Sequence, residues 1–242
     1  MKVAVIGDIH GTTKFLDCYM KIQQNDPNVD KIIVLGDWFD PYDNIDLDIM
    51  IERYNEFVDI WKSDDRIISI LGNHDIAGYI IENDCTSRTV RFGKNRQRII
   101  DAIEPNLPNS YLTYKIGDYM FSHAGISQFW LDDIKQYTYP EINYADAVMN
   151  CKKGWTAEEL SDICTFYPCD FSGYGNNKYQ SCVWIRPSAL IDGAIDGYNQ
   201  VVAHTKVKNI AKFQLPNGKD LWLVDDDQKP NYLLLDIENS LF

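Results

Sequence analysis

All four histidines in this sequence stand where an apolar segment ends, in short stretches that contain glycine or another small residue. They are His10, His74, His123 and His204. An imidazole can bind a metal ion, and its pKa near neutrality also lets it donate or accept a proton. A single histidine at the end of a strand is more often a hydrogen-bonded core residue than a ligand. Four of four at equivalent places is hard to reach by chance, so the sequence indicates a functional site built on imidazoles.

Carboxylate and amide side chains stand at the same junctions. The apolar segments end in GDIHG at 7–11, GDWFD at 36–40, GNHD at 72–75, SHAG at 122–125 and AHT at 203–205. An aspartate beside glycine can by itself be a turn or helix-cap residue. In open α/β sheets, however, ligands bind beyond the carboxyl ends of the strands. If the five ends meet, they surround one spot with ligands suited to zinc, iron or manganese, namely Asp8, His10, Asp37, Asn73, His123 and His204.

Five short apolar segments are the strands that must position these residues, and they are predicted at 3–6, 31–35, 66–71, 119–122 and 200–203. Periodicity predicts helices at 13–24, 45–62, 127–137 and 145–150. The Gly117-Asp118 turn indicates a hairpin of 111–116 and 119–122, and the segments 212–215, 220–224 and 231–237 predict a β-meander. Strand–helix alternation followed by antiparallel strands predicts an α/β fold of mixed α+β character, a sandwich of mixed sheets with helices outside.

Length and charge limit the classes of partner. The chain has 242 residues, no repeats and no Pro/Gly/Ser-rich linker, so we expect a single domain over 1–242. The net charge of −13 argues against a general nucleic-acid binder. It does not exclude an anionic substrate, because a bound cation can invert the local field. No apolar run reaches about 18 residues, so we expect no membrane span.

The cysteines favour a reducing compartment. There are six, without a secretory signal: Cys18, Cys85, Cys151, Cys164, Cys169 and Cys182. This usage is typical of reduced thiols, so we expect a cytoplasmic protein. Four of the six fall between Cys151 and Cys182, which leaves a structural zinc site as an alternative. The spacings contain no C-x-x-C pair, and free thiols are therefore the preferred interpretation.

Taken in order, the five motifs resemble the signature of the calcineurin-like metallophosphoesterases. The resemblance is closest to the protein serine/threonine phosphatases and the related bacterial diadenosine tetraphosphate hydrolases. It runs from residue 7 to residue 205, and although each motif alone is weak, the ordered set is specific. The resemblance implies a sandwich of two mixed sheets flanked by helices. It also implies two divalent metal ions, for which we expect manganese, with iron, zinc and nickel as alternatives.

The resemblance also implies how the metals are held. Asp37 would bridge the two ions, while Asp8 and His10 would bind the first, and Asn73, His123 and His204 the second. Two divalent ions about 3.5–4 Å apart can clamp the attacking and leaving oxygens of a phosphoryl transfer and lower the pKa of a bridging water. The resulting hydroxide would attack phosphorus in line, without a covalent enzyme intermediate.

Further roles follow from the same resemblance. His74 would be the general acid that protonates the leaving oxygen, with Asp40 holding its imidazole charged and oriented. Asp40 could instead be a helix cap before the predicted helix at 45–62. Arg186, within VWIRP, resembles a phosphate-binding arginine of bacterial and phage members, although a structural ion pair is the alternative. Arg186 and Asn73 are the candidate substrate-binding residues.

The chain departs from the protein phosphatases at two arginine positions. Those enzymes continue GDxxD with Arg-Gly and place an arginine before GNH, whereas this chain has Pro41-Tyr42 and Leu71 there. The one basic cluster, RTVRFGKNRQR at 88–98, could overhang the site and replace the missing arginines. A solvated helix face is the preferred interpretation of that cluster. The polar segment at 172–181 is predicted to be a loop near the site.

Three functions remain open at this point. The first is a metal-dependent phosphatase that hydrolyses a phosphate monoester, either a phosphoprotein or a small ester. The second is a hydrolase of nucleotide anhydrides or diesters, such as dinucleoside polyphosphates. The third is an inactive scaffold that binds a partner, which is disfavoured because every ligand position and the acid are filled. In the first two cases the partner is a phosphorylated substrate, and neither membrane nor nucleic acid is expected.

Overall fold

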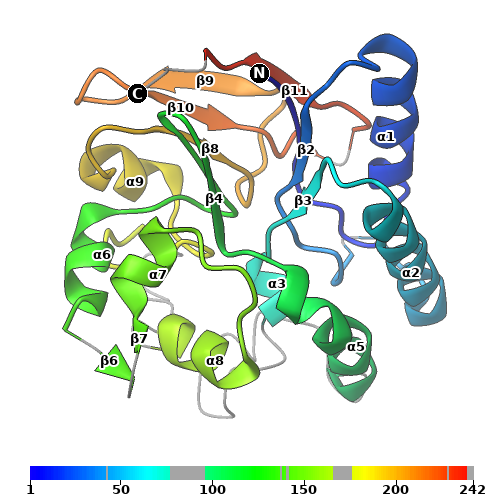
Figure 1. The fold of residues 1–242 in the computed structure, drawn as a ribbon, viewed down its shortest axis with the longest axis horizontal. Coiled ribbons are helices and arrows are strands. Elements are labelled where there is room, and N and C mark those ends of the chain that lie inside the picture. Colours follow the sequence, from blue (N-terminus) through cyan, green and yellow to red (C-terminus); the bar gives the residue numbers. More distant parts are fainter. Residues whose placement is uncertain are drawn as a thin grey trace.

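Two mixed β-sheets, one of four strands and one of five, form the centre of the molecule. The computed structural model describes residues 1–41, 43–76, 96–136, 138–139, 142–165, 176–227 and 229–238. Helices flank the sheets (Figure 1). This arrangement confirms the predicted fold class, an α/β sandwich of two mixed sheets with helices outside.

The first sheet combines the beginning of the chain with one late strand. Its strands are β1 (Lys2–Ile6), β2 (Lys31–Val34), β3 (Ile67–Ser69) and β11 (Leu233–Asp236). The order is β11-β1-β2-β3, in which β1, β2 and β3 are parallel and β11 is antiparallel to β1. Parallel neighbours need crossovers, which contain α1 (Lys14–Asn25) and α2 (Leu47–Ser63). The carboxyl ends of β1, β2 and β3 therefore lie at one edge of the sheet.

The second sheet comes from the later part of the chain. Its strands are β4 (Thr113–Ile116), β5 (Tyr119–Ser122), β8 (Asn199–Val202), β9 (Ala211–Gln214) and β10 (Asp220–Leu223). The order is β4-β5-β8-β10-β9, and the outer pairs are antiparallel. The three central strands β5, β8 and β10 are parallel, so their carboxyl ends also share an edge.

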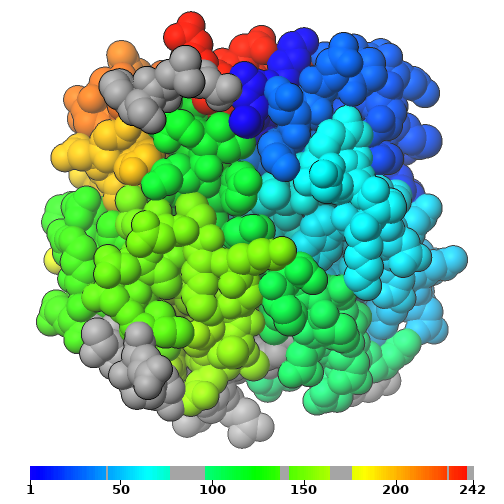
Figure 2. Space-filling model, in the orientation of Figure 1, coloured from blue at the N-terminus to red at the C-terminus, as the bar shows by residue number. Residues whose placement is uncertain are grey.

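The remaining elements surround the sheets. They are α3 (Asn73–Ile76), α5 (Arg96–Ile103), a 3₁₀ helix (Glu104–Asn109), α6 (Gln128–Ile134), β6 (Thr138–Tyr139), β7 (Ile142–Asn143), α7 (Tyr144–Met149), α8 (Ala157–Thr165) and α9 (Pro187–Gly193). Figure 1 shows α1 and α2 beside the first sheet, α9 beside the second, and α6, α7 and α8 grouped below it. In Figure 2 the start of the chain covers the right of this face and the middle of the chain the lower left.

Apolar side chains from the facing sides of the two sheets form one buried cluster. It joins Val5 and Ile33 of the first sheet to Phe121 and Val201 of the second. The opposite side of the first sheet packs on α1 and α2, where Phe15 and other apolar residues are buried. Almost every side chain of β1, β2 and β3 is therefore buried, so both faces of these parallel strands are covered.

The predicted elements are mostly confirmed, with one error of topology. The segments at 212–215 and 220–224 do pair as β9 and β10, but β11 leaves this sheet and pairs with β1 instead. The predicted meander over all three segments is therefore wrong. Alternation along a strand shows which side chains are buried, but it does not show which sheet supplies the neighbour. The helix predicted at 127–137 is also shorter, and it ends at Ile134.

Two further predictions were that the chain has no membrane span and that its cysteines are free thiols. Within the part of the chain that the structure describes, no helix has the length and apolar character that a bilayer crossing requires. Cys18, Cys151 and Cys182 are free thiols. Cys85, Cys169 and the side chain of Cys164 lie outside the described residues, so the zinc alternative over Cys151–Cys182 stays a hypothesis.

Candidate metal centre

The five strand ends converge, and they bring the predicted ligands together. Residues that follow β1, β2, β5 and β8 form two groups of buried side chains, and within each group the possible ligand atoms lie within 4.8 Å of one another. One group is Asp8, His10 and Asp37, and the other is Asp37, His123 and His204. Asp37 belongs to both groups, which is the position that a bridging ligand must occupy.

Asn73 joins the second group as the first residue of α3, which begins four residues after the end of β3. Its Oδ1 lies 2.9 Å from Nε2 of His123, and Nδ1 of His204 lies 3.2 Å from the same nitrogen. Oδ2 of Asp37 lies 3.3 Å from it. Three hydrogen-bond acceptors therefore surround the N–H at Nε2 of His123. Amide oxygen, imidazole nitrogen and carboxylate oxygen are also ligand types that bind divalent transition metals. The second group could hold a cation where that proton now lies.

The first group is equally buried, but its atoms lie somewhat farther apart. Nε2 of His10 lies 3.5 Å from Oδ2 of Asp8 and 3.8 Å from Oδ2 of Asp37. Oδ1 of Asp8 accepts a hydrogen bond from the backbone N–H of His204 at 3.1 Å. That bond links the two groups and fixes the rotamer of the Asp8 carboxylate.

Backbone carbonyls set the orientation of the three ligand imidazoles. Nδ1 of His10 donates to the carbonyls of Phe39 and Asp40 at 3.1 and 3.0 Å. Nδ1 of His123 donates to Leu35 O at 2.7 Å, and Nε2 of His204 donates to Trp184 O at 3.1 Å. Because a carbonyl only accepts, the nitrogen that faces it must carry a proton. The second nitrogen of each ring is then the one directed at the other residues of the site. Metal-binding histidines have this arrangement, so the residues present fit two metal ions.

The site also concentrates unusual backbone geometry. His10, Asp37, Asp40 and His204 have φ angles of 47°, 54°, 63° and 59°. Non-glycine residues in this left-handed region are uncommon and cluster at functional sites. The strand ends also approach closely, because a Cβ atom on Gly72 would lie 2.1 Å from Oδ1 of Asp37. Only glycine fits there.

One buried carboxylate that the sequence analysis did not select supports Asp37. Asp75 accepts hydrogen bonds from the backbone N–H groups of Asp37, Trp38 and Gly72 at 2.9, 2.8 and 2.8 Å. Burial and the negative charge of Asp37 raise the pKa of Asp75 to about 6. The motif GNHD contains Asp75, but only the loop geometry shows that its side chain ties the end of β2 to that of β3.

The predicted ligands form a dense network of charges. Burial opposes ionisation of Asp8, but the imidazoliums of His123 and His10 outweigh it and lower the pKa of Asp8 to about 2. The pKa of Asp37 is lowered in the same way, mainly by His123 and His74 against burial. Burial opposes protonation of His10 and His123 as well, yet the two carboxylates raise their pKa values to about 9 and about 10. The carboxylates are thus ionised and available to a cation.

His204 behaves differently from the other two ligand imidazoles. Burial, the guanidinium of Arg186 and the charge of His123 hold the pKa of His204 well below its ordinary value. Arg186 donates from Nη1 to His204 O at 2.7 Å and to Thr205 Oγ1 at 3.0 Å. The structure therefore brings the half-buried Arg186 next to the second group of ligands.

His74 lies beside the ligands and is the most exposed of the four histidines. Its Nδ1 lies 2.9 Å from Oδ2 of Asp40, and its Nε2 lies 3.9 Å from Oδ2 of Asp37. Its side chain is 16% exposed, so it can reach a molecule bound over the site. Asp40 does not cap the following helix, which was the alternative role considered for it. The N-cap of α2 is Asp46, whose side chain accepts a hydrogen bond from the backbone N–H of Asp48.

Two predicted site features fall largely outside the described residues. Of the basic stretch 88–98, only 96–98 is described. Arg98 lies in α5, where its guanidinium pairs with Asp48 on the exposed surface. Of the loop 172–181, only 176–181 is described. A role of either segment at the site therefore stays a prediction.

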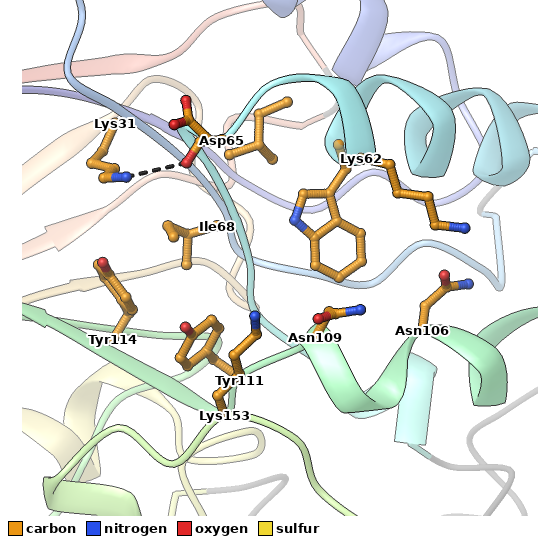
Figure 3. Close-up of a pocket in the computed structure, with 11 residues that line it drawn as sticks. Lys31, Lys62, Asp65, Ile68, Asn106, Asn109, Tyr111, Tyr114 and Lys153 are labelled. Carbon is orange, nitrogen blue, oxygen red and sulfur yellow. Dashed lines mark hydrogen bonds between the residues drawn. The ribbon is translucent and has the colours of Figure 1, made fainter.

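A cavity of about 440 Å³ lies at the other end of the first sheet. Lys31 and Ile67, the first residues of β2 and β3, line it together with Tyr111 and Tyr114 (Figure 3). The predicted ligands follow the carboxyl ends of these same strands. None of the predicted site residues is among the described residues that line this cavity.

Comparisons with known proteins agree with the motifs and the fold. A family model described as calcineurin-like phosphoesterase matches residues 1–178. A search of curated proteins found no match. Among solved structures, the chain is similar to a point mutant of a cold-active protein tyrosine phosphatase, with 16% identity over 94% of this chain and 71% of that chain and a TM-score of 0.53.

Two further solved structures have lower TM-scores. One is a metallophosphoesterase from Sphaerobacter thermophilus, at 16% identity over 98% of this chain and 84% of that chain, with a TM-score of 0.46. The other is a protein serine/threonine phosphatase from Saccharomyces cerevisiae with similarity to human phosphatase PP5, at 15% identity over 93% and 66% of the two chains, also at 0.46. At such identities the likeness concerns the fold alone.

Proposed function

Because the chain belongs to the calcineurin-like phosphoesterase family, we propose that it is a metal-dependent phosphatase that hydrolyses a phosphate monoester. The observation that carries this proposal is the position of Asp37 in both groups of buried ligand atoms. A side chain shared in this way can hold two cations close together, which is the arrangement that phosphoryl transfer at a two-metal site needs.

In the proposed centre each ion has its own ligands in addition to Asp37. Asp8 and His10 would hold the first ion, and Asn73, His123 and His204 would hold the second. When bound, two divalent ions supply the nucleophile by lowering the pKa of water and neutralise charge on the phosphate. We propose manganese, and iron, zinc and nickel suit the same nitrogen and oxygen donors.

His74 is the proposed general acid. Its contact with Asp40 through Nδ1 leaves Nε2 to face the site, where it can donate a proton to the leaving oxygen. Asp40 stabilises the protonated ring and fixes its orientation. An alkyl alcohol leaves poorly without a proton, so this step matters most for phosphoserine-like substrates.

Arg186 and Asn73 are the proposed groups that bind the phosphate. Nη1 of Arg186 donates to His204 O and Thr205 Oγ1, which holds the guanidinium beside the second group of ligands, and a planar guanidinium matches the geometry of a phosphate. Nδ2 of Asn73 is buried and has no hydrogen-bond partner among the described residues. An amide N–H in that position can donate to a phosphate oxygen while Oδ1 binds the metal.

A second candidate function is hydrolysis of nucleotide anhydrides or diesters, such as dinucleoside polyphosphates. It is favoured by Leu71, which is buried at the position where the protein phosphatases have an arginine. An inactive scaffold is the least favoured alternative, since every ligand and the acid are present. We also propose a cytoplasmic location, because Cys18, Cys151 and Cys182 are free thiols.

A substrate panel with manganese tests the proposal. It comprises nitrophenyl phosphate, phosphoserine and phosphotyrosine peptides, diadenosine tetraphosphate and a bis-ester, with Asp37→Asn as the control. We expect hydrolysis of the monoesters, loss of activity in Asp37→Asn, and about two bound metal ions per chain in the wild type. Preference for diadenosine tetraphosphate would support the second candidate. No bound metal and no activity on any compound would support the scaffold.

A further inference from the structure

A sixth strand end reaches the edge that carries the proposed metal ligands. β10 is parallel to β8, and the N–H of Val224 donates to Val202 O at 2.8 Å. The next residue, Asp225, accepts from the N–H of Val207 at 2.8 Å through its carbonyl. Asp225 therefore follows β10 as His204 follows β8, at the same edge of the second sheet.

The backbone at Asp225 is in contact with the residue before Asp8. A Cβ atom on Gly7 would lie 2.6 Å from Val224 O and 3.1 Å from the Cα of Asp225. Only a glycine at position 7 allows this approach. The strand end that carries Asp8 and the strand end that carries Asp225 are thus packed directly against each other.

The side chain of Asp225 is buried and lacks a partner. Asp225 is 1% exposed, and neither carboxylate oxygen has a hydrogen-bond partner among the described residues. The neighbouring Asp226 differs, because its Oδ2 accepts from Asn231 Nδ2 at 2.7 Å and its Oδ1 lies 3.4 Å from Nζ of the buried Lys14. Lys14 thus forms its ion pair with Asp226, and Asp225 forms none within the described structure.

A buried carboxylate without partners destabilises a fold unless a cation compensates it. Burial and the negative charge of Asp8 raise the pKa of Asp225 to about 7, against the smaller effects of Lys14 and His10. Of the charged groups that act on Asp225, three (Asp8, His10 and Asp37) form the first ligand group, and the fourth is Lys14. That group has three side chains, Asp8, His10 and Asp37, whereas four are brought together around the second.

We propose that Asp225 is a further carboxylate of the first metal site, where it stabilises the cation that Asp8, His10 and Asp37 hold. This inference rests on the proposed metal centre and extends it by one residue. It gives the buried Asp225 carboxylate a partner that the described residues do not supply. The charge of Asp225 would add to those of Asp8 and Asp37 around the first cation.

Metal titration of Asp225→Asn tests the inference, because asparagine keeps the shape and removes the charge. Titration with Mn²⁺ gives the affinity of each site, and thermal unfolding with chelator gives the stability of the metal-free protein. We expect the affinity of the first site, which has fewer protein ligands, to fall about 10–100-fold, while the affinity of the second is nearly unchanged. A change of this size is usual for a group next to a metal ligand. We also expect a higher Tm of the metal-free variant, because a buried charge is gone.

Asp226→Asn is the matched control, since the two aspartates are adjacent and equally buried. It breaks the pair with Lys14, so we expect a lower Tm with both metal affinities nearly unchanged. Unchanged metal affinity in Asp225→Asn would overturn the inference, and so would failure of that variant to fold, because the carboxylate would then serve the fold. A wild type that binds no metal would instead overturn the proposed function.

Discussion

Oδ2 of Asp75 accepts a hydrogen bond from the backbone N–H of Asp37 at 2.9 Å, so one buried carboxylate holds the backbone of the ligand shared by both groups. The same side chain binds the N–H groups of Trp38 and Gly72. Asp75 therefore links the backbone that follows β2 to the backbone that follows β3. The left-handed conformation of Asp37, with φ of 54°, is stabilised by these bonds.

Removal of the Asp75 carboxylate should destabilise the protein and disturb the metal centre together. Asp75→Ala leaves three buried N–H groups without an acceptor, at about 1–3 kcal/mol each by general experience, although relaxation reduces the sum. We expect a large loss in the free energy of unfolding, measured by urea titration, and weaker binding of Mn²⁺. Asp132→Asn, at an exposed residue paired with Lys135, is the control and should change neither quantity. Normal metal binding in Asp75→Ala would contradict this role.

Much of the centre could be predicted because its signals are local. Each ligand follows an apolar run and stands beside a glycine or a small residue, and five such endings must meet at the carboxyl edges of parallel strands. The sequence therefore predicted the general fold and the residues that the structure brings together, while their role as metal ligands stays a prediction. Which residue donates to which carbonyl, as in Nδ1 of His123 to Leu35 O, depends on loop geometry that no spacing shows.

The residues that were missed have signals that are ambiguous in a sequence. Asp225, Asp226 and Asp227 form a run of three acids after β10, and such a run usually lies in solvent. In the structure Asp227 is exposed and pairs with Lys206 at 2.9 Å, but the first two are buried. Gly7 packs against Val224 and Asp225, while Asp226 contacts Lys14 and Asn231, and neither set of contacts can be read from the run of acids. The pairing of β11 with β1 was missed for a similar reason, because it is a contact across nearly the whole chain.

Replacement of His74 should separate acid catalysis from metal binding. In His74→Asn we expect normal metal content and a kcat lower by about 10²–10⁴-fold on an alkyl phosphate, with a smaller loss on nitrophenyl phosphate, whose leaving group needs no proton. Asp40→Asn should follow the same pattern to a lesser degree, because it acts through His74. Full activity of His74→Asn on an alkyl phosphate would exclude the acid role.

Replacement of Arg186 should weaken the binding of phosphate. Arg186→Ala removes the guanidinium and its bonds to His204 O and Thr205 Oγ1, so we expect a higher KM and weaker inhibition by inorganic phosphate. Arg186→Lys keeps the charge without the planar fork and should recover part of the loss. If inhibition by phosphate were the same in all three proteins, Arg186 would have only the structural role that its bond to the His204 carbonyl already provides.

The charges of the metal-free centre predict that metal binding releases protons. The pKa values of His10 and His123 are raised to about 9 and about 10, so both imidazoles are protonated near neutral pH. Both must lose a proton to bind a metal ion. We expect calorimetric titration with Mn²⁺, in two buffers of different ionisation enthalpy, to show release of nearly two protons from the imidazoles at neutral pH, together with the fraction of a proton that Asp225 carries. Release should fall towards zero above about pH 10, and affinity should rise with pH below that point.

The same pKa shifts predict opposite pH dependences of stability for the two forms of the protein. The pKa of His10 is raised from 6.5 to about 9, so its contribution to the metal-free protein is complete below pH 6.5 and is lost as the pH rises through 9. The pKa of Asp8 is lowered from 3.8 to about 2, so its contribution is present above pH 3.8 and is lost as the pH falls through 2. Between neutral pH and 9, the Tm in chelator should therefore fall while the added stability from Mn²⁺ grows. A constant difference between the two melting curves would mean that the protons on these imidazoles and the metal ions do not compete for the same atoms.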